Sequence, residues 1–258
     1  MQKALIQMNL QLHKVISDIT GVTGIAIIKA ILDGERDPKI LAKLRNKQIK
    51  NDEEAIANAL VGDYREEHLF SLKQEYDLYC FYQVEIAECD NQILMFYQNS
   101  SDQIDTVEKP LVKRKSKGRK AHPKFDLRHE LYRIIGVDTT TIPGFDVLTV
   151  QSIVSEVGLD MDKWPTEKHF ASWLGLSPGN KISGDKVLST KTRKVINRAT
   201  VAFRMAAYAA GKSQTALGAY YRCLKSRLGA PKAITATARK LACLFYRLLK
   251  FGSEYIVQ

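Results

Sequence analysis

The chain has 258 residues, of which 45% are hydrophobic, and a formal net charge of +11 at pH 7. This apolar content excludes a chain that is disordered throughout, and the length is enough for two domains with separate cores. The N-terminus lacks the charged and apolar regions of a signal peptide, and no window approaches the roughly 18 apolar residues that a membrane span needs. We therefore expect a soluble, cytoplasmic protein.

The charge is unevenly distributed along the chain. Residues 1–108 hold eleven basic and eighteen acidic side chains, residues 109–124 hold eight basic and no acidic ones, and residues 186–253 hold fifteen Lys or Arg and no Asp or Glu. A surface without carboxylates attracts polyanions, and each phosphate that it neutralises releases a bound counterion. The pattern favours a nucleic-acid partner, and an ordinary solvated basic face is the alternative.

None of the four cysteines belongs to a CxxC pair, and none has a histidine within a few residues. They are Cys80, Cys89, Cys223 and Cys243. This spacing predicts neither a zinc site nor a disulfide framework. We expect small buried thiols in a reducing cytoplasm.

Apolar residues recur at helical spacing near the N-terminus, at Leu5, Met8, Leu12, Val15 and Ile16. Residues 19–24 interrupt this pattern before an apolar helix resumes at 25–32, which predicts a hairpin between two helices. Gly21 and Gly24 permit positive φ and a close approach of backbone amides to a ligand, as in helix-hairpin-helix modules that bind a DNA phosphate. A tight turn that only packs two helices explains the same glycines.

Two further helices are predicted at residues 54–60, ended by Gly62, and at residues 66–98. The longer helix has a heptad pattern. One seam position holds Leu69, Tyr76, Gln83, Asp90 and Tyr97, and the other holds Leu72, Tyr79, Ile86 and Ile93. The pattern favours an antiparallel helical hairpin or a coiled-coil dimer whose register is fixed by Gln83 and Asp90, and a core stripe within one chain is the alternative.

Residues 99–124 have almost no apolar periodicity and contain the run KRKSKGRK at 113–120. This composition predicts a flexible basic linker that tracks a nucleic-acid backbone. An incidental solvated tract has the same composition. The linker divides the chain into a helical connector at residues 1–98 and a C-terminal domain at residues 125–258.

The C-terminal domain is predicted to be helical again from residue 125. The expected helices lie at residues 125–135, 148–157 (ended by Gly158), 169–174 (ended by Gly175), 192–210 and 233–251. The helix at 192–210 places Ile196, Ala199, Phe203, Ala206, Ala207 and Ala210 on one face, with Arg193, Asn197 and Arg204 beside it. Residues 182–188 predict a β-hairpin with its turn at Gly184-Asp185. The fold class is therefore mainly α, with at most one short β-hairpin.

A second glycine turn appears at residues 142–145, IPGF. Aligning Ile19 with Ile142 places Gly21 on Gly144, so the chain is expected to contain a degenerate repeat of the helix-hairpin-helix-like turn. Asp146 adds a carboxylate beside this second turn, which weakens its interpretation as a phosphate site. Gly144 is the candidate DNA-contacting residue of this copy.

Several motifs occur in order within residues 142–210: IPGF, FASWLGLSP at 170–178, SGDK at 183–186 and KTRKVINRATVAFRMAA from residue 191. This series resembles the C-terminal domain of the bacterial DEDD-type insertion-sequence transposases related to pilin-gene invertases, some of which are guided by a bridge RNA. The segment MNLQLHKVISDITGVTG and the Tyr-rich helix at 78–90 resemble the part that connects the two catalytic domains of that family. The resemblance implies that Ser183 is the nucleophile and that Asn197, Arg198 and Arg204 follow it on a helix.

The resemblance also implies a RuvC-like domain whose four carboxylates bind divalent metal and which precedes residue 1. We expect this chain to start after that domain, as an internal start, a degraded element or half of a split protein. Asp102, Asp105 and Glu108 have the spacing of a carboxylate cluster but no strand pattern around them. They are not expected to replace the acidic site, so Mg²⁺ belongs to the missing domain and no cofactor is expected on this chain.

A serine hydroxyl is a poor nucleophile at neutral pH and needs a base or a cationic environment. All five histidines lie at or before residue 169, so arginines are the better candidates to support Ser183. Arg193, Arg198 and Arg204 suit bidentate phosphate contacts, and Lys186 adds a point charge. The implied reaction is attack on a DNA phosphodiester to give a phosphoserine link, which a hydroxyl of another strand resolves. Without the acidic domain, the chain alone is expected to be a weak or inactive recombinase.

The expected partners are DNA, a guide (bridge) RNA as in some family members, and a second copy or a full-length transposase. The expected location is the bacterial cytoplasm, on the nucleoid when DNA is bound. Two rival functions stay open. One is a non-catalytic nucleic-acid-binding fragment that regulates full-length transposase through the helix at 66–98. The other is a structure-specific DNA-repair factor that uses the paired glycine turns.

Overall fold

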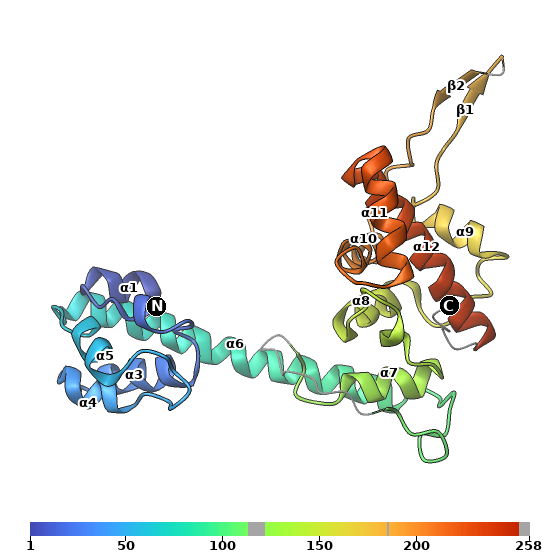
Figure 1. Cartoon of the computed structure of the whole chain (residues 1–258). Coiled ribbons are helices and arrows are strands. Elements are labelled where there is room, and N and C mark those ends of the chain that lie inside the picture. Colours follow the sequence, from blue (N-terminus) through green and yellow to red (C-terminus); the bar gives the residue numbers. More distant parts are fainter. Residues whose placement is uncertain (113–121, 185, 253–258) are drawn as a thin grey trace. The chain divides into compact units, whose positions relative to one another are not determined.

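The computed structural model describes residues 1–112, 122–184 and 186–252, with only the backbone at Lys181, Ile182 and Val187. The described chain is mainly helical, as predicted, with one two-stranded antiparallel sheet (Figure 1). It divides into two compact units, Met1–Cys89 and Asp90–Gln258, called here the N-terminal unit and the C-terminal unit. The basic run at 113–120 lies outside the described residues. None of the described helices has both the length and the apolar character that a membrane span requires.

The N-terminal unit packs short helices around an aliphatic core. They are α1 (Gln2–Gln7), α2 (Leu12–Val15), α3 (Val22–Leu32), α4 (Pro38–Lys43) and α5 (Glu53–Ala59), followed by α6 (Glu66–Gln98). The Asp37 and Asp52 side chains cap α4 and α5 by accepting hydrogen bonds from the backbone N–H groups of Lys39 and Ala55, at 2.9 and 2.8 Å. The helix predicted at residues 54–60 is confirmed to within one residue.

The first apolar run is not one continuous helical face, which corrects the expectation from its spacing. Asn9 has φ +60° and separates α1 from α2. Met8, Leu10 and Leu12 are all fully buried. Because positions i, i+2 and i+4 cannot all face one side of an α-helix, the chain breaks at Asn9 to bring Leu10 into the core.

Helix α6 has the bounds that the heptad pattern predicts. Near its start, Leu72 is buried in the core of the N-terminal unit, where Leu69 and Tyr76 pack against it. Near its end, Tyr97 is buried in the core of the C-terminal unit, with Ile93 packed against it. Both ends of the seam are thus core stripes within the chain. Apolar side chains between these ends are 50–64% exposed: Leu78, Phe81, Tyr82, Val84 and Ile86.

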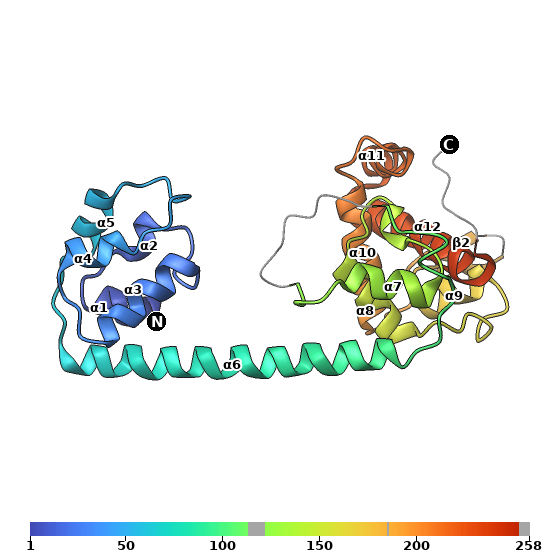
Figure 2. The ribbon, with the colours of Figure 1, turned by 90° about the horizontal axis from the view of Figure 1, so that it is seen from below.

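The C-terminal unit is a helical body that carries one β-hairpin (Figures 1 and 2). Its elements are α7 (Leu127–Ile135), the 3-10 helix η1 (Thr139–Thr141), α8 (Val147–Val157), α9 (Glu167–Trp173), β1 (Lys181–Ser183), β2 (Lys186–Ser189), α10 (Arg198–Ala210), α11 (Ala216–Leu228) and α12 (Ala230–Phe251). Helices α10 and α12 pack against each other, α8 packs on α10, and α9 and α11 pack on α12.

A cluster of aromatic rings fills the centre of this body. Phe203 lies 5.9 Å from Phe145, 6.2 Å from Phe170 and 5.7 Å from Phe245, measured between ring centroids. Phe170, Phe203 and Phe245 are fully buried. Edge-to-face contacts of this kind add to the free energy of burying the rings. Phe145 comes from the turn before α8, and the cluster joins this turn with α9, α10 and α12 in one core.

Two expectations about this unit need correction. The helix predicted at residues 192–210 begins only at Arg198, and Ile196, which was expected to face inward, is fully exposed at 103%. Helix α11 is separate from α12, and the sequence did not predict it individually. The predicted helices at 148–157, 169–174 and 233–251 are present as α8, α9 and α12, and the hairpin at 182–188 is confirmed.

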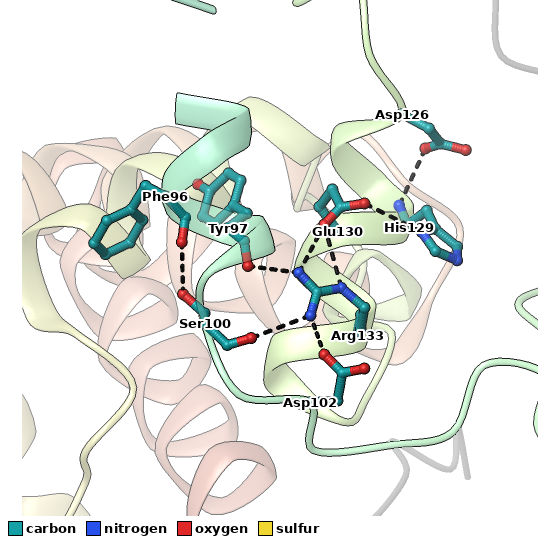
Figure 3. Close-up of polar contacts among 8 residues, drawn as sticks. All are labelled: Phe96, Tyr97, Ser100, Asp102, Asp126, His129, Glu130 and Arg133. Atoms are coloured by element: carbon teal, nitrogen blue, oxygen red, sulfur yellow. Dashed lines mark hydrogen bonds and ion pairs between the residues drawn. The ribbon is translucent and has the colours of Figure 1, made fainter. Parts of the chain in front are cut away.

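Arg133 on α7 ties the segment after α6 to the body of the C-terminal unit (Figure 3). Its guanidinium donates to the carbonyl oxygens of Tyr97 and Ser100, at 2.5 and 3.2 Å, and pairs with Glu130 and Asp102. The same segment also accepts hydrogen bonds at Lys109 O from Tyr132 Oη and at Val112 O from Arg128, at 3.1 and 2.9 Å. Residues 99–112 are therefore held by α7, in contrast to the flexible linker expected there.

The cysteines differ from the buried thiols that were expected. Cys89 and Cys223 are exposed, and Cys80 and Cys243 are half-buried. All four are free thiols. Burial raises the pKa of the Cys243 thiol, with a further increase from the charge of Glu167.

Candidate nucleic-acid interface and serine nucleophile

Ser183 is the last residue of β1, beside the turn of the hairpin. It pairs with Lys186, the first residue of β2, and Gly184 between them has φ +52°. Both paired side chains are exposed, and Figure 1 shows the hairpin extending away from α10, α11 and α12. Asp185 lies outside the described residues. The serine hydroxyl is thus carried near the tip of an exposed projection.

The strand register determines which charge accompanies this hydroxyl. Directly paired residues of an antiparallel hairpin project on the same face, with Cβ atoms roughly 5 Å apart. The register therefore places the cation Lys186 beside Ser183. The base of the hairpin is closed by a bridge between Pro178 and Thr192 and a hydrogen bond from Gly179 N to Lys191 O (3.0 Å).

Arg193 lies just beyond the base of the hairpin and is directed to α9. Its guanidinium donates to the carbonyl oxygen of Ser172 at 3.3 Å. A Cβ at Gly175 would lie 2.9 Å from Arg193 O and 2.7 Å from a Val195 methyl carbon, so this stretch packs on the end of α9. Arg193 is exposed and available to an anion there, and it follows Thr192, which closes the base of the hairpin.

Asn197 is the N-cap of α10. Its side-chain oxygen accepts a hydrogen bond from the backbone N–H of Thr200 at 2.6 Å, and the Thr200 hydroxyl donates to Leu174 O at 2.7 Å. The cap explains why α10 begins at Arg198, although the apolar periodicity continues upstream. The Asn197 side chain thus has a structural role besides any contact with DNA.

We expect Asn197→Ala to lower the free energy of unfolding of the C-terminal unit by about 1 kcal/mol, because one backbone N–H loses its partner. Asn197→Asp keeps a capping oxygen but adds a negative charge that repels phosphate. It should retain stability and lower DNA affinity. Urea unfolding and DNA titration of both variants measure the two effects. Equal stability of Asn197→Ala and the unmodified chain would contradict the capping role.

Arg198 and Arg204 both lie on α10, on the helical body rather than on the hairpin. Arg198 is exposed in the first turn. Arg204 is half-buried, and its Nε is buried without a hydrogen-bond partner among the described residues. Exposed apolar side chains occupy the same helix, at Val201, Met205 and Tyr208. The structure therefore brings Lys186 to Ser183, whereas Arg193, Arg198 and Arg204 lie elsewhere in the unit.

Gly144 occupies the turn between η1 and α8 with φ +95°. A Cβ at this position would lie 2.2 Å from the carbonyl oxygen of Ala206, so the turn packs directly on α10. Asp146 caps α8 by accepting a hydrogen bond from Thr149 N at 2.8 Å. Close packing of the turn on α10 thus explains Gly144, and its predicted contact with DNA stays a prediction.

The first glycine turn differs from the second. Gly21 is the N-cap of α3 with φ −76°, and Gly24 lies buried within α3, so neither needs the positive φ that was expected. A Cβ at Gly24 would lie 2.1 Å from Ile19 O, which explains that glycine by helix packing. Helix α3 begins one residue after Gly21, whereas α8 begins three residues after Gly144. The two turns are not copies of one local structure.

A cavity of about 690 Å³ lies beside the start of α3 in the N-terminal unit. Its lining includes Gly21, Lys14 and Lys50, and also the carboxylate of Asp18. The N-cap residue of α3 is Gly21, which has no side chain that could cap the helix. The two lysines and the N-terminus of α3 favour binding of an anion in this cavity, whereas the negative charge of Asp18 disfavours it.

The carboxylates at 102–108 do not form a metal site. Asp102 pairs with Arg133, and Asp105 accepts a hydrogen bond from the backbone N–H of Val107 at 2.8 Å. Across residues 1–112, 122–184 and 186–252, no group of three or more His, Cys, Asp or Glu side chains could hold a metal ion. The expectation that Mg²⁺ belongs to a separate acidic domain stays a prediction.

Residues 139–222 match the model of a protein family described as the Transposase IS116/IS110/IS902 family. The match covers about a third of the chain and runs from η1 into α11, so it includes Gly144, Ser183 and α10. No curated protein matches the chain. The match supports an insertion-sequence transposase, in agreement with the resemblance of the motifs.

Proposed function

We propose that the chain is the DNA-binding, serine-bearing part of an insertion-sequence transposase. The observation that carries the proposal is the position of Ser183, which is exposed beside the tip of a hairpin within the segment that matches the transposase family. The acid-free stretch at 186–253 supports a DNA partner because nothing in it repels phosphate.

In the proposed reaction, the Ser183 Oγ forms a bond to the phosphorus of a DNA phosphodiester. The bond from phosphorus to one sugar oxygen breaks, the serine proton passes to water, and the sugar oxygen takes a proton from water and leaves as a hydroxyl. A free hydroxyl of another strand then attacks the phosphoserine and restores the serine. Each step makes one P–O bond and breaks one, so no ATP is needed.

The proposed DNA contacts lie in both units. Lys186 is beside the serine, while Arg193, Asn197, Arg198 and Gly144 belong to the helical body, together with Arg204. In the N-terminal unit, the turn at Gly21 and Gly24 contributes through the cavity that contains Lys14 and Lys50. Because Ser183 and the arginines are apart within their unit, we propose that DNA or another protein segment completes the charge environment of the serine.

The proposed protein partner is a second copy or a full-length transposase that binds α6. This role is supported by the exposed apolar side chains between Leu78 and Ile86. The guide RNA is proposed for the basic residues at 109–124, of which 113–121 lie outside the described residues. We propose that any divalent metal is held by a separate acidic domain, as the resemblance implies.

A non-catalytic role is the second candidate function. It is favoured by one observation: Ser183 ends β1 of the projecting hairpin, whereas Arg198 and Arg204 belong to α10 in the helical body (Figure 1). In this alternative the chain binds DNA through its helical body and regulates a full-length transposase through α6. Ser183 then has no chemical role.

Trapping of a covalent protein–DNA adduct tests the proposal. The full chain is incubated with labelled, nicked DNA that carries the ends of the insertion sequence, with Mg²⁺ and co-purifying RNA, and is analysed on a denaturing gel. We expect an adduct that maps to Ser183 by mass spectrometry, is absent in Ser183→Ala and persists in Ser189→Ala, the matched control on β2. Intact DNA binding without any adduct would support the non-catalytic role instead.

A further inference from the structure

A basic groove lies between three helices of the C-terminal unit, apart from the hairpin and from α10. Its lining comes from α9, α11 and α12, and its volume is about 430 Å³. That volume falls within the range of roughly 300–1,000 Å³ typical of small-ligand pockets. None of its residues belongs to the contacts proposed above for Ser183.

Cations dominate the lining of this groove. Lys168 comes from α9, and Arg239, Lys240 and Arg247 come from one face of α12. The spacing from Arg239 to Arg247 corresponds to about 12 Å along the helix axis. Glu167 contributes the one carboxylate of the lining, and it binds Arg247 through both oxygens, with Oε1 2.8 Å from Nη2. Three cations are left without a carboxylate partner in the groove, so the groove favours an anion.

An aromatic ring completes the groove. Tyr220 on α11 is half-buried, and Lys240 Nζ lies 4.5 Å from the centroid of its ring. The attraction of an ammonium to a ring face is weak at an exposed site, whereas its attraction to a phosphate is that of two full charges. A phosphate that enters the groove therefore draws Lys240 away and exposes the ring face to a base. Proteins bind unpaired nucleotides with this combination of cations and a stacking ring.

We propose that this groove binds an unpaired nucleotide of single-stranded nucleic acid, with the base on Tyr220 and the phosphates on Lys168, Arg239 and Lys240. This site depends on the proposed function in one respect, which is that both require the chain to bind nucleic acid. It is built from different helices, and the volume suits one nucleotide rather than a duplex. An acidic peptide could satisfy the cations but would not use the ring.

Binding of labelled oligothymidylate and oligouridylate, followed by fluorescence anisotropy at several salt concentrations, tests this site in the full chain. Arg239→Gln/Lys240→Gln should weaken binding and reduce the slope of log affinity against log salt by about 1.4, because each phosphate contact on a single strand contributes about 0.7. Tyr220→Leu should weaken binding by about tenfold with an unchanged slope. The two oligonucleotides distinguish DNA from RNA as the source of the strand.

Lys225→Gln/Arg227→Gln is the matched control, because both side chains are exposed on α11 outside the groove lining. An equal loss of affinity in this control would overturn the site, because binding would then depend on the overall positive charge. Full displacement of the strand by polyglutamate would overturn it for the same reason. Unfolding curves of each variant exclude loss of fold. If every groove variant binds both duplex and single-stranded nucleic acid as tightly as the unmodified chain, the groove site is refuted but the proposed function is not. No binding of any nucleic acid by the unmodified chain refutes the proposed function as well.

Discussion

Gly144→Ala is expected to lower the free energy of unfolding of the C-terminal unit by about 3 kcal/mol or more. Alanine at φ +95° adds backbone strain of about 1–3 kcal/mol. The new Cβ would also lie 2.2 Å from Ala206 O and 3.0 Å from the Cβ of Ala210, so α8 and α10 must move apart. Overpacking of this kind adds about 1–3 kcal/mol.

Tryptophan fluorescence during urea unfolding measures this loss in the full chain. The sequence has two tryptophans, Trp164 and Trp173, and both belong to the C-terminal unit, so the signal follows that unit. Gly229→Ala is the control, because Gly229 has φ +81° but no heavy atom within 4 Å of an added Cβ. Gly229→Ala should therefore lose stability through backbone strain alone, without a steric clash. Equal losses in the two variants would mean that the contact with α10 does not matter.

Phe203→Ala is expected to lower the free energy of unfolding of the same unit by about 3–5 kcal/mol. Phe203 is fully buried at the centre of the aromatic cluster, where it contacts the rings of Phe145, Phe170 and Phe245. Its removal leaves a cavity that helices joined by so many contacts cannot close. The same fluorescence experiment measures the change.

Phe251→Ala provides the comparison for this second substitution. Phe251 ends α12 and is 67% exposed, so its loss should change stability by no more than about 0.5 kcal/mol. A loss below about 1 kcal/mol for Phe203→Ala would show that the four helices do not form one cooperative core. It would also weaken the argument that α10 is held rigidly by its buried face.

Local signals explain the parts of the fold that could be predicted from the sequence. The bounds of α6 follow from a long periodic run after Gly62, and the hairpin follows from the glycine turn beside Ser183. The start of α10 was placed too early because the apolar pattern passes through Ile196. The capping role of Asn197, three residues before Thr200, was the local signal that marks the true start.

Tertiary contacts explain what could not be predicted. Gly144 is explained by Ala206 O, which is 62 residues away along the chain, and nothing in the sequence indicates that this carbonyl lies beside the glycine. The grouping of Lys168, Tyr220 and Lys240 depends on the packing of three helices. Likewise, the arginines are expected from the sequence to support Ser183, whereas Ser183 belongs to the hairpin and Arg198 and Arg204 belong to α10.

The acid-free stretch also affects the stability of the chain when no partner is bound. Among the described residues, Arg247 and Lys250 are the cations of this stretch that form ion pairs with acids, namely Glu167 and Asp162. The other like charges repel one another, which opposes compact folding. A bound polyanion removes this repulsion, so ligand binding and folding are thermodynamically linked. The C-terminal unit is therefore expected to be more stable in the proposed complex with nucleic acid than alone, and the stability of the free unit is expected to rise with ionic strength.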